Sequence, residues 1–267
     1  SDLSRLLALT LVATVVIAAC GSDAETPTPT TEAAPDTTEA VVATTDAPVE
    51  TSPETSEAAP ETTEAALADF ETLPAGPYDV GVTTITINAD SERPLTLDVW
   101  FPITDAGDAP PHQYTPIPGV YYESPDAVTA TPDQIAPDGP YPLVVYTHGS
   151  GGQRYIASYY TEAIASYGYV VAAPDHTGNT AVDRLAGAEA EFDVTALNRP
   201  NDVVATIDAM LDPTNTETVG FVAAIDPESI AVTGHSFGGF TALAVSGGYE
   251  NSLGSFVADD RVDAIIP

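Results

Sequence analysis

The chain has 267 residues, of which 40 are acidic and 6 are basic, so its formal net charge at pH 7 is −34. This charge excludes nucleic acid as a partner, because phosphate binding needs a basic surface. The hydrophobic fraction of 43% is enough for the core of one large or two small domains, and a single Cys excludes an intramolecular disulfide.

An apolar run lies near the N-terminus, over residues 6–19. It is shorter than the roughly 20 apolar residues of a transmembrane helix, and its length is typical of a signal peptide. The run ends in IAACG, residues 17–21, which resembles the lipobox of bacterial lipoproteins. The resemblance implies that Cys20 is lipidated and anchors the protein to a membrane, on the extracellular side of the bacterial cell envelope. An ordinary signal peptide with an incidental Cys is the alternative.

A tract rich in Thr, Glu, Pro and Ala follows, over residues 21–73. It contains neither Arg nor Lys, and low hydrophobicity with charge of one sign cannot offset the entropy cost of folding. We predict a disordered, extended linker that holds the folded part away from the membrane. The predicted parts are therefore a signal peptide (1–20), a linker (21–73) and a folded domain (74–267).

The folded part begins with two strands, predicted over residues 82–87 and 95–101. Both segments are rich in β-branched or aromatic residues, and a turn around residues 90–94 makes them a hairpin. Residues 102–139 are rich in Pro, Asp and Tyr and are predicted to be a loop that contains at most short elements, in which His112 is exposed to solvent.

Apolar strands and helices then alternate along the chain. Strands are predicted over residues 141–147, 169–173, 229–233 and 262–266, and helices over residues 156–167, 202–211 and 237–245. Residues 174–197 are predicted to be a loop, with Pro200 near the first turn of the next helix, where Pro is tolerated. This alternation predicts an α/β fold with a mostly parallel sheet and helices on both faces. No helix follows the last strand, so we expect the domain to be incomplete at Pro267.

The segment GHSFGG, residues 234–239, matches the G-x-S-x-G pattern of a nucleophile elbow. In such an elbow the Ser lies on a sharp strand-to-helix turn, and the residues two before and two after it crowd one another. Gly234 and Gly238 meet that need for small residues. An apolar strand precedes the pattern and a helix of small residues follows it, which is the context that the motif requires. We predict that Ser236 is a catalytic nucleophile; a Gly-rich structural turn is the alternative.

A second glycine-rich segment, HGSGG (residues 148–152), follows the strand at 141–147. The segments YPLVVYTHGSGGQR, YGYVVAAPDHTGN, RPNDVVATIDAML and AVTGHSFGG resemble the dienelactone hydrolase-like and platelet-activating-factor acetylhydrolase-like group of α/β-hydrolases. The resemblance covers residues 95–267. It implies an α/β-hydrolase fold and cofactor-free hydrolysis of small or polymeric carboxylic esters through an acyl-enzyme on Ser236. It also implies that the backbone N–H groups of Ser150 and Phe237 form the oxyanion hole.

The acid and the base of a Ser-acid-His triad follow the elbow in this fold. All histidines lie at or before the elbow, namely His112, His148, His176 and His235. We predict that His148 and His235 pack or orient loops, and that His176 has a loop role, with contact to substrate as the alternative. Asp175 and Asp202 are predicted to be structural. Asp259, Asp260 and Asp263 lie at the wrong end of the last predicted strand. The triad acid and base are therefore expected beyond Pro267, and the chain alone is expected to be nearly inactive.

Other site types find no support in the sequence. No His pair has the spacing of metal ligands, and nucleotide-binding glycine patterns are absent, so we expect neither a metal nor a cofactor. Two alternatives to an esterase stay open. One is a peptidase or an acyltransferase on the same fold, and the other is a non-catalytic cell-surface binding protein.

Overall fold

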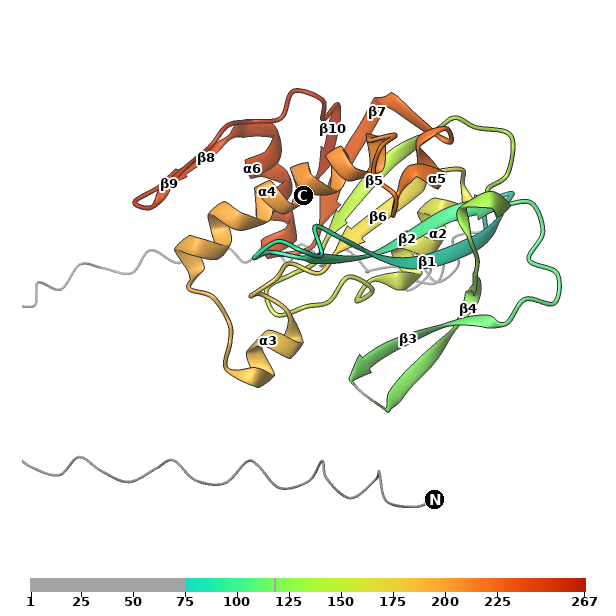
Figure 1. Cartoon of the computed structure of the whole chain (residues 1–267), viewed down its shortest axis with the longest axis horizontal. Helices are drawn as coiled ribbons and strands as arrows, with labels where there is room; N and C mark the ends of the chain where they lie inside the picture. The colour runs from blue at the N-terminus through green and yellow to red at the C-terminus, as the bar shows by residue number, and fades with distance from the viewer. Residues whose placement is uncertain (1–74, 118) are drawn as a thin grey trace, which may run out of the picture. The chain divides into compact units, whose positions relative to one another are not determined.

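The computed structural model describes residues 75–117 and 119–267 (Figure 1). The predicted signal peptide, Cys20 and the predicted linker lie outside the described residues. No helix within the described ranges is both long and apolar enough to cross a membrane.

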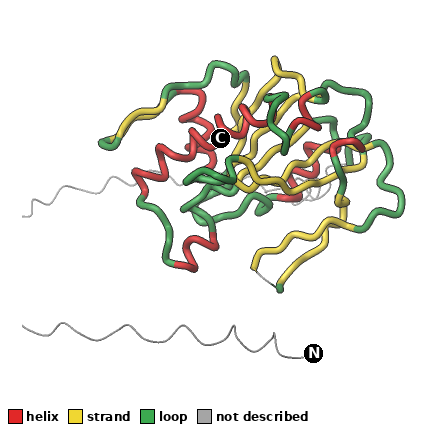
Figure 2. The backbone as a smooth tube through the Cα atoms, viewed as in Figure 1, coloured by secondary structure: helices red, strands yellow, loops and turns green. Residues whose placement is uncertain are grey.

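A mixed sheet of eight strands forms the centre of the described part (Figure 2). Its strands are β1 (Asp79–Ile87), β2 (Leu95–Ile103), β3 (Pro111–Ile117), β4 (Val120–Thr129), β5 (Tyr141–Thr147), β6 (Val170–Pro174), β7 (Ile225–Gly234) and β10 (Ala264–Ile266). Their order across the sheet is β10-β7-β5-β6-β2-β1-β4-β3. The first four strands in this order are mutually parallel, and β2 runs antiparallel to both β6 and β1. The predicted α/β class is confirmed.

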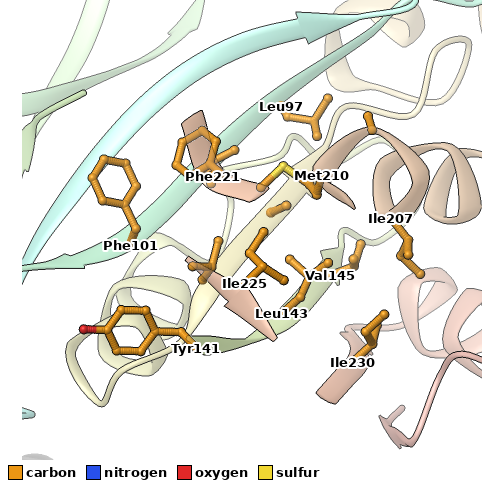
Figure 3. Packing of buried hydrophobic residues seen from close by; sticks show 14 of the residues in the cluster. Leu97, Phe101, Tyr141, Leu143, Val145, Ile207, Met210, Phe221, Ile225 and Ile230 are labelled. Carbon is orange, nitrogen blue, oxygen red and sulfur yellow. The ribbon is translucent and has the colours of Figure 1, made fainter. Parts of the chain in front are cut away.

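Helices cover both faces of the sheet. They are α2 (Ser158–Ser166), α3 (Ala181–Ala186), α4 (Phe192–Leu211), α5 (Val219–Val222) and α6 (Phe237–Gly247), with a 3₁₀ turn η1 (Pro132–Gln134) and a small hairpin of β8 (Tyr249–Asn251) and β9 (Gly254–Phe256). Alternate residues of β5 point to opposite faces. Leu143 and Val145 belong to a core with α4, α5 and α6 (Figure 3), whereas Val144 and Tyr146 belong to a second core with α2.

The prediction that residues 102–139 form a loop with at most short elements is wrong, because this stretch contains strands of 7 and 10 residues. These strands, β3 and β4, form a hairpin at the edge of the sheet and join it by parallel pairing of β4 with β1. The prolines of β3 are tolerated because an edge strand leaves N–H positions unpaired. His112 is likewise not solvated: it is buried, its Nδ1 lies 3.0 Å from Thr129 Oγ1, and its ring packs edge-on against Tyr114.

The predicted loop at 174–197 is also partly helical. A capping box of Thr180 and Asp183 starts α3, and Gly187 with φ of 67° ends it. The helix predicted from residue 202 begins at Phe192 instead, so that Pro200 lies in its interior and not in its first turn. The low helix propensity of proline led to the wrong helix start, because tertiary contacts of the neighbouring residues override that propensity.

Candidate active site

Ser236 lies between the last residue of β7 and the first residue of α6. Its backbone has φ of 57° and ψ of −115°, and Asn88 is the only other non-Gly residue with positive φ in the ranges that the structure describes. Strained backbone of this kind is concentrated at functional sites. The side chain is exposed, so the sharp turn presents the hydroxyl to solvent.

The two glycines of the elbow are required because neighbouring backbone lies too close to them for a Cβ atom. A Cβ on Gly238 would lie 1.8 Å from the carbonyl oxygen of Thr147, at the end of β5. A Cβ on Gly234 would lie 2.5 Å from the same oxygen and 2.6 Å from the carbonyl carbon of Gly238. The mutual crowding predicted from the sequence is therefore present, and the end of β5 adds a stronger constraint that the motif alone did not reveal.

The HGSGG loop lies directly against the elbow. Strands β5 and β7 are parallel neighbours in which Thr147 pairs with Gly234, so both loops leave the same edge of the sheet. A Cβ on Gly149 would lie 3.6 Å from the Cβ of Ser236 and 3.4 Å from Nδ1 of His235. The structure thus brings together the two motifs that the sequence analysis singled out.

Two backbone amides at this junction have no acceptor in the described part of the chain. Phe237 is the first residue of α6, where a helix leaves its N–H groups without intrahelical partners. The Ser150 amide likewise has no acceptor among the described residues, whereas the next two amides are paired: Gly151 donates to the carbonyl of Asn179 at 3.1 Å and Gly152 to that of Gly149 at 3.0 Å. The N-terminus of α6 adds a partial positive charge, so this corner can receive an anion.

A cavity of about 310 Å³ opens beside these amides. It is lined by Ser150, Asn179, Glu189, Ala190, Glu191, Phe192, Thr195 and Phe237. The rings of Phe192 and Phe237 stack with their centroids 5.2 Å apart and form its apolar wall. The volume lies at the small end of the range for ligand pockets.

His148, the first residue of the HGSGG loop, and His176 are both fully buried. Nδ1 of His148 lies 2.7 Å from the carbonyl of Gly149, so this nitrogen must carry a proton and donate it, and Nε2 accepts the N–H of His176 at 3.2 Å. The ring of His176 bridges Thr147 Oγ1 at 2.7 Å and Asp202 Oδ2 at 2.8 Å. Both rings are therefore held in place by hydrogen bonds within the scaffold, as expected of loop-orienting residues. Burial lowers the pKa of each well below its usual value.

The aspartates that were predicted to be structural have structural partners. Asp202 accepts two hydrogen bonds of 2.6 Å from Arg93, in addition to the contact with His176. Asp175 accepts from the backbone and the guanidinium of Arg154 at 2.7 and 2.6 Å. Both carboxylates form ion pairs inside the fold, so they are not available to act on a substrate.

The base and the acid of a triad stay unassigned. Within the described ranges the Ser236 hydroxyl makes no hydrogen bond to an imidazole or a carboxylate. At the start of β10, Asp259 pairs with Arg261, and Asp263 accepts from the amide of Ile230. No cluster of three or more His, Cys, Asp or Glu side chains in the described residues is arranged to hold a metal ion.

The neutral state of His148 predicts a pH dependence of stability. Unfolded His148 gains a proton near pH 6.5, whereas the folded side chain stays neutral, so the unfolded state binds more protons as the pH falls. We expect the unfolding free energy of the wild type, relative to His148→Asn, to decrease below pH 6.5 by up to about 1.4 kcal/mol per pH unit. Urea denaturation of both proteins between pH 7.5 and 5.0 measures this difference. Parallel stability curves would contradict it.

The similarity to known proteins is partial. Residues 119–192 match the family model described as platelet-activating factor acetylhydrolase, isoform II; this range includes Ser150 but not the elbow. Among solved structures, a ferulic acid esterase from Streptomyces cinnamoneus matches with 23% identity and a TM-score of 0.49, over 63% of this chain and 55% of that chain. The chain thus spans about half the length of that esterase. The described part has an α/β fold built on a mixed, partly parallel sheet, and residues 119–192 resemble the acetylhydrolase family.

Proposed function

We propose that the protein is a serine hydrolase that cleaves carboxylic esters through an acyl-enzyme on Ser236. One observation carries the proposal: Ser236 has a positive φ at a strand-to-helix turn, and the HGSGG loop lies against it. The match of residues 119–192 to an acetylhydrolase family supports the same chemistry.

The geometry suits acyl transfer. The Ser236 hydroxyl attacks the ester carbonyl carbon while a general base takes its proton, and the carbonyl π electrons move to oxygen. The amides of Ser150 and Phe237 donate hydrogen bonds to this oxyanion, and the N-terminus of α6 favours its charge. Collapse of the intermediate expels the alkoxide, which takes the proton back from the base and leaves as the alcohol. Water then attacks the acyl-enzyme with the same assistance, and the acid is released while Ser236 regains its proton. By the resemblance, the base is a His that comes after the nucleophile, and residues 237–267 contain none.

The substrate is proposed to present a small acyl group to the cavity beside Ser150 and Phe237, because that cavity measures only about 310 Å³. The alcohol part of the ester, small or polymeric, would extend into solvent from the exposed elbow. Initial rates with p-nitrophenyl acetate, butyrate and decanoate test this, with acetyl p-nitroanilide as the amide control; here and in all assays below, the protein is expressed from its complete coding sequence. We expect turnover of the short esters and little turnover of the amide. Faster cleavage of the anilide would favour a peptidase.

We propose further that Cys20 carries a lipid anchor, a prediction that rests on the sequence alone. Bacterial cells that express the protein and take up radiolabelled palmitate should yield a labelled protein that partitions into the detergent phase of Triton X-114. Cys20→Ser should abolish both the label and the partitioning. A labelled Cys20→Ser protein, or an unlabelled wild type, would contradict the anchor.

A further inference from the structure

Arg199, on α4, is fully buried next to the candidate site. Its Nη2 group donates to the carbonyl of His148 and, at 2.9 Å, to Oγ1 of Thr147. Its Nη1 group donates to Oδ1 of Asn179 at 2.7 Å, and its Nε to Oγ1 of Thr241 at 3.1 Å. The guanidinium is thus bonded to three separate segments of the chain.

These partners hold the two segments that carry the free amides. On one side, Asn179 accepts the amide of Gly151 with its carbonyl, and its Nδ2 lies 3.4 Å from Oγ of Ser150. On the other side, Thr241 donates at 2.8 Å to the carbonyl of Phe237. The guanidinium also lies over the ring of Phe237, 4.8 Å from its centroid. One side chain therefore connects the HGSGG loop to the first turn of α6.

The charge of Arg199 has no direct counter-ion. No carboxylate of the described residues lies within ion-pair distance of it, and nearby Asp202 is bonded to Arg93 and His176. Burial lowers the pKa of Arg199 to about 9, which still leaves it protonated at neutral pH. A buried charge without a partner is costly, and groups of this kind are concentrated at functional sites.

We propose that Arg199 is a positioning residue for the oxyanion hole, which fixes the amides of Ser150 and Phe237 relative to each other and offsets the oxyanion's negative charge. The inference rests on the proposed function. Preorganised donors and charges need no reorganisation when the oxyanion forms, so they act on the transition state more than on bound substrate. The neutral ester ground state gains little from the same charge.

The test compares Arg199→Gln and Arg199→Lys with a matched control, Arg154→Gln. Arg154 is another largely buried arginine, but it pairs with Asp98 and Asp175 and makes no bond to the loop or to the elbow. The measurements are kcat and KM for p-nitrophenyl acetate, and the inhibition constant of phenylboronic acid, which forms a tetrahedral anion on a catalytic serine. Thermal unfolding of each protein reports the structural cost separately.

For Arg199→Gln we expect kcat to fall about 100-fold with KM changed less than about threefold. The inhibition constant of the boronic acid should rise in parallel. Arg199→Lys keeps the charge and should recover part of the loss, whereas Arg154→Gln should lower thermal stability without lowering kcat. An Arg199→Gln enzyme that is less stable but keeps its kcat, or that changes only in KM, would overturn the inference.

Amide hydrogen exchange separates this inference from the proposed function, because it needs no catalysis. Exchange in the segments around residues 148–152 and 237–241 should be faster in Arg199→Gln than in the wild type, and unchanged in Arg154→Gln. Unchanged exchange in Arg199→Gln would overturn the positioning role. If the wild type hydrolyses no ester, the proposed function fails and the oxyanion role with it, while faster exchange would still support the connection between loop and elbow.

Discussion

Replacement of Ser236 by Ala is expected to reduce ester hydrolysis by about 10⁴- to 10⁶-fold in kcat, the range seen when a serine hydrolase loses its nucleophile. The reason is that no acyl-enzyme can form, and the remaining amides only stabilise attack by water. KM and the thermal unfolding temperature should change little, because the side chain is exposed and makes no hydrogen bond in the described part. Steady-state kinetics with p-nitrophenyl acetate measure the effect.

Ser246→Ala is the matched control for this prediction. Ser246 is an exposed serine near the other end of α6, so its replacement makes the same chemical change on the same helix. Its kcat should stay within about twofold of the wild type, as for most surface substitutions. Residual hydrolysis in Ser236→Ala that matches the control would show that the ester is cleaved elsewhere.

The second large effect is expected for Gly238→Ala, which should destabilise the domain by more than about 3 kcal/mol or prevent folding. The new Cβ would lie 1.8 Å from the carbonyl oxygen of Thr147, and this oxygen belongs to backbone at the end of a central strand. Either α6 or β5 must move, and any such movement displaces Ser236 from the HGSGG loop. Urea denaturation gives the change in unfolding free energy, and ester hydrolysis should be lost as well.

Gly247→Ala provides the control for this substitution. Gly247 is the last residue of the same helix, its φ is ordinary, and a Cβ there meets nothing within 4 Å. Ala in place of Gly should therefore be neutral or stabilise the protein by up to about 1 kcal/mol. A Gly238→Ala protein as stable as Gly247→Ala would refute the close packing between the elbow and β5.

The parts of the fold that the sequence predicted best are those with a local signal. The predicted strand 141–147 coincides with β5, since a strand buried on both faces is a continuous apolar run. The hairpin of β3 and β4 escaped prediction because its stability depends on distant partners. Val80 of β1, for example, pairs with Ala127 of β4, and no periodicity within the hairpin itself reveals this pairing.

The candidate site divides in the same way. Ser236 and its glycines form a short contiguous motif with a known geometric reason, so the sequence alone predicts their place at the elbow. Arg199 could not be predicted as a connecting residue. Its partners come from three places: the end of β5, the segment that follows β6, and helix α6. Only the folded chain brings these three places together. The segment RPND belongs to the stretches that resemble a known family, but this resemblance assigns no role to its arginine.

The most direct test of the central claim is covalent labelling of the nucleophile. The protein, expressed from its complete coding sequence, is incubated with a fluorophosphonate, and tandem mass spectrometry locates the adduct. An activated serine displaces fluoride and keeps the phosphonyl group, and we predict a single adduct on Ser236 that forms as ester hydrolysis is lost. An adduct on another residue, or an unlabelled Ser236 in a protein that still hydrolyses esters, would contradict the account.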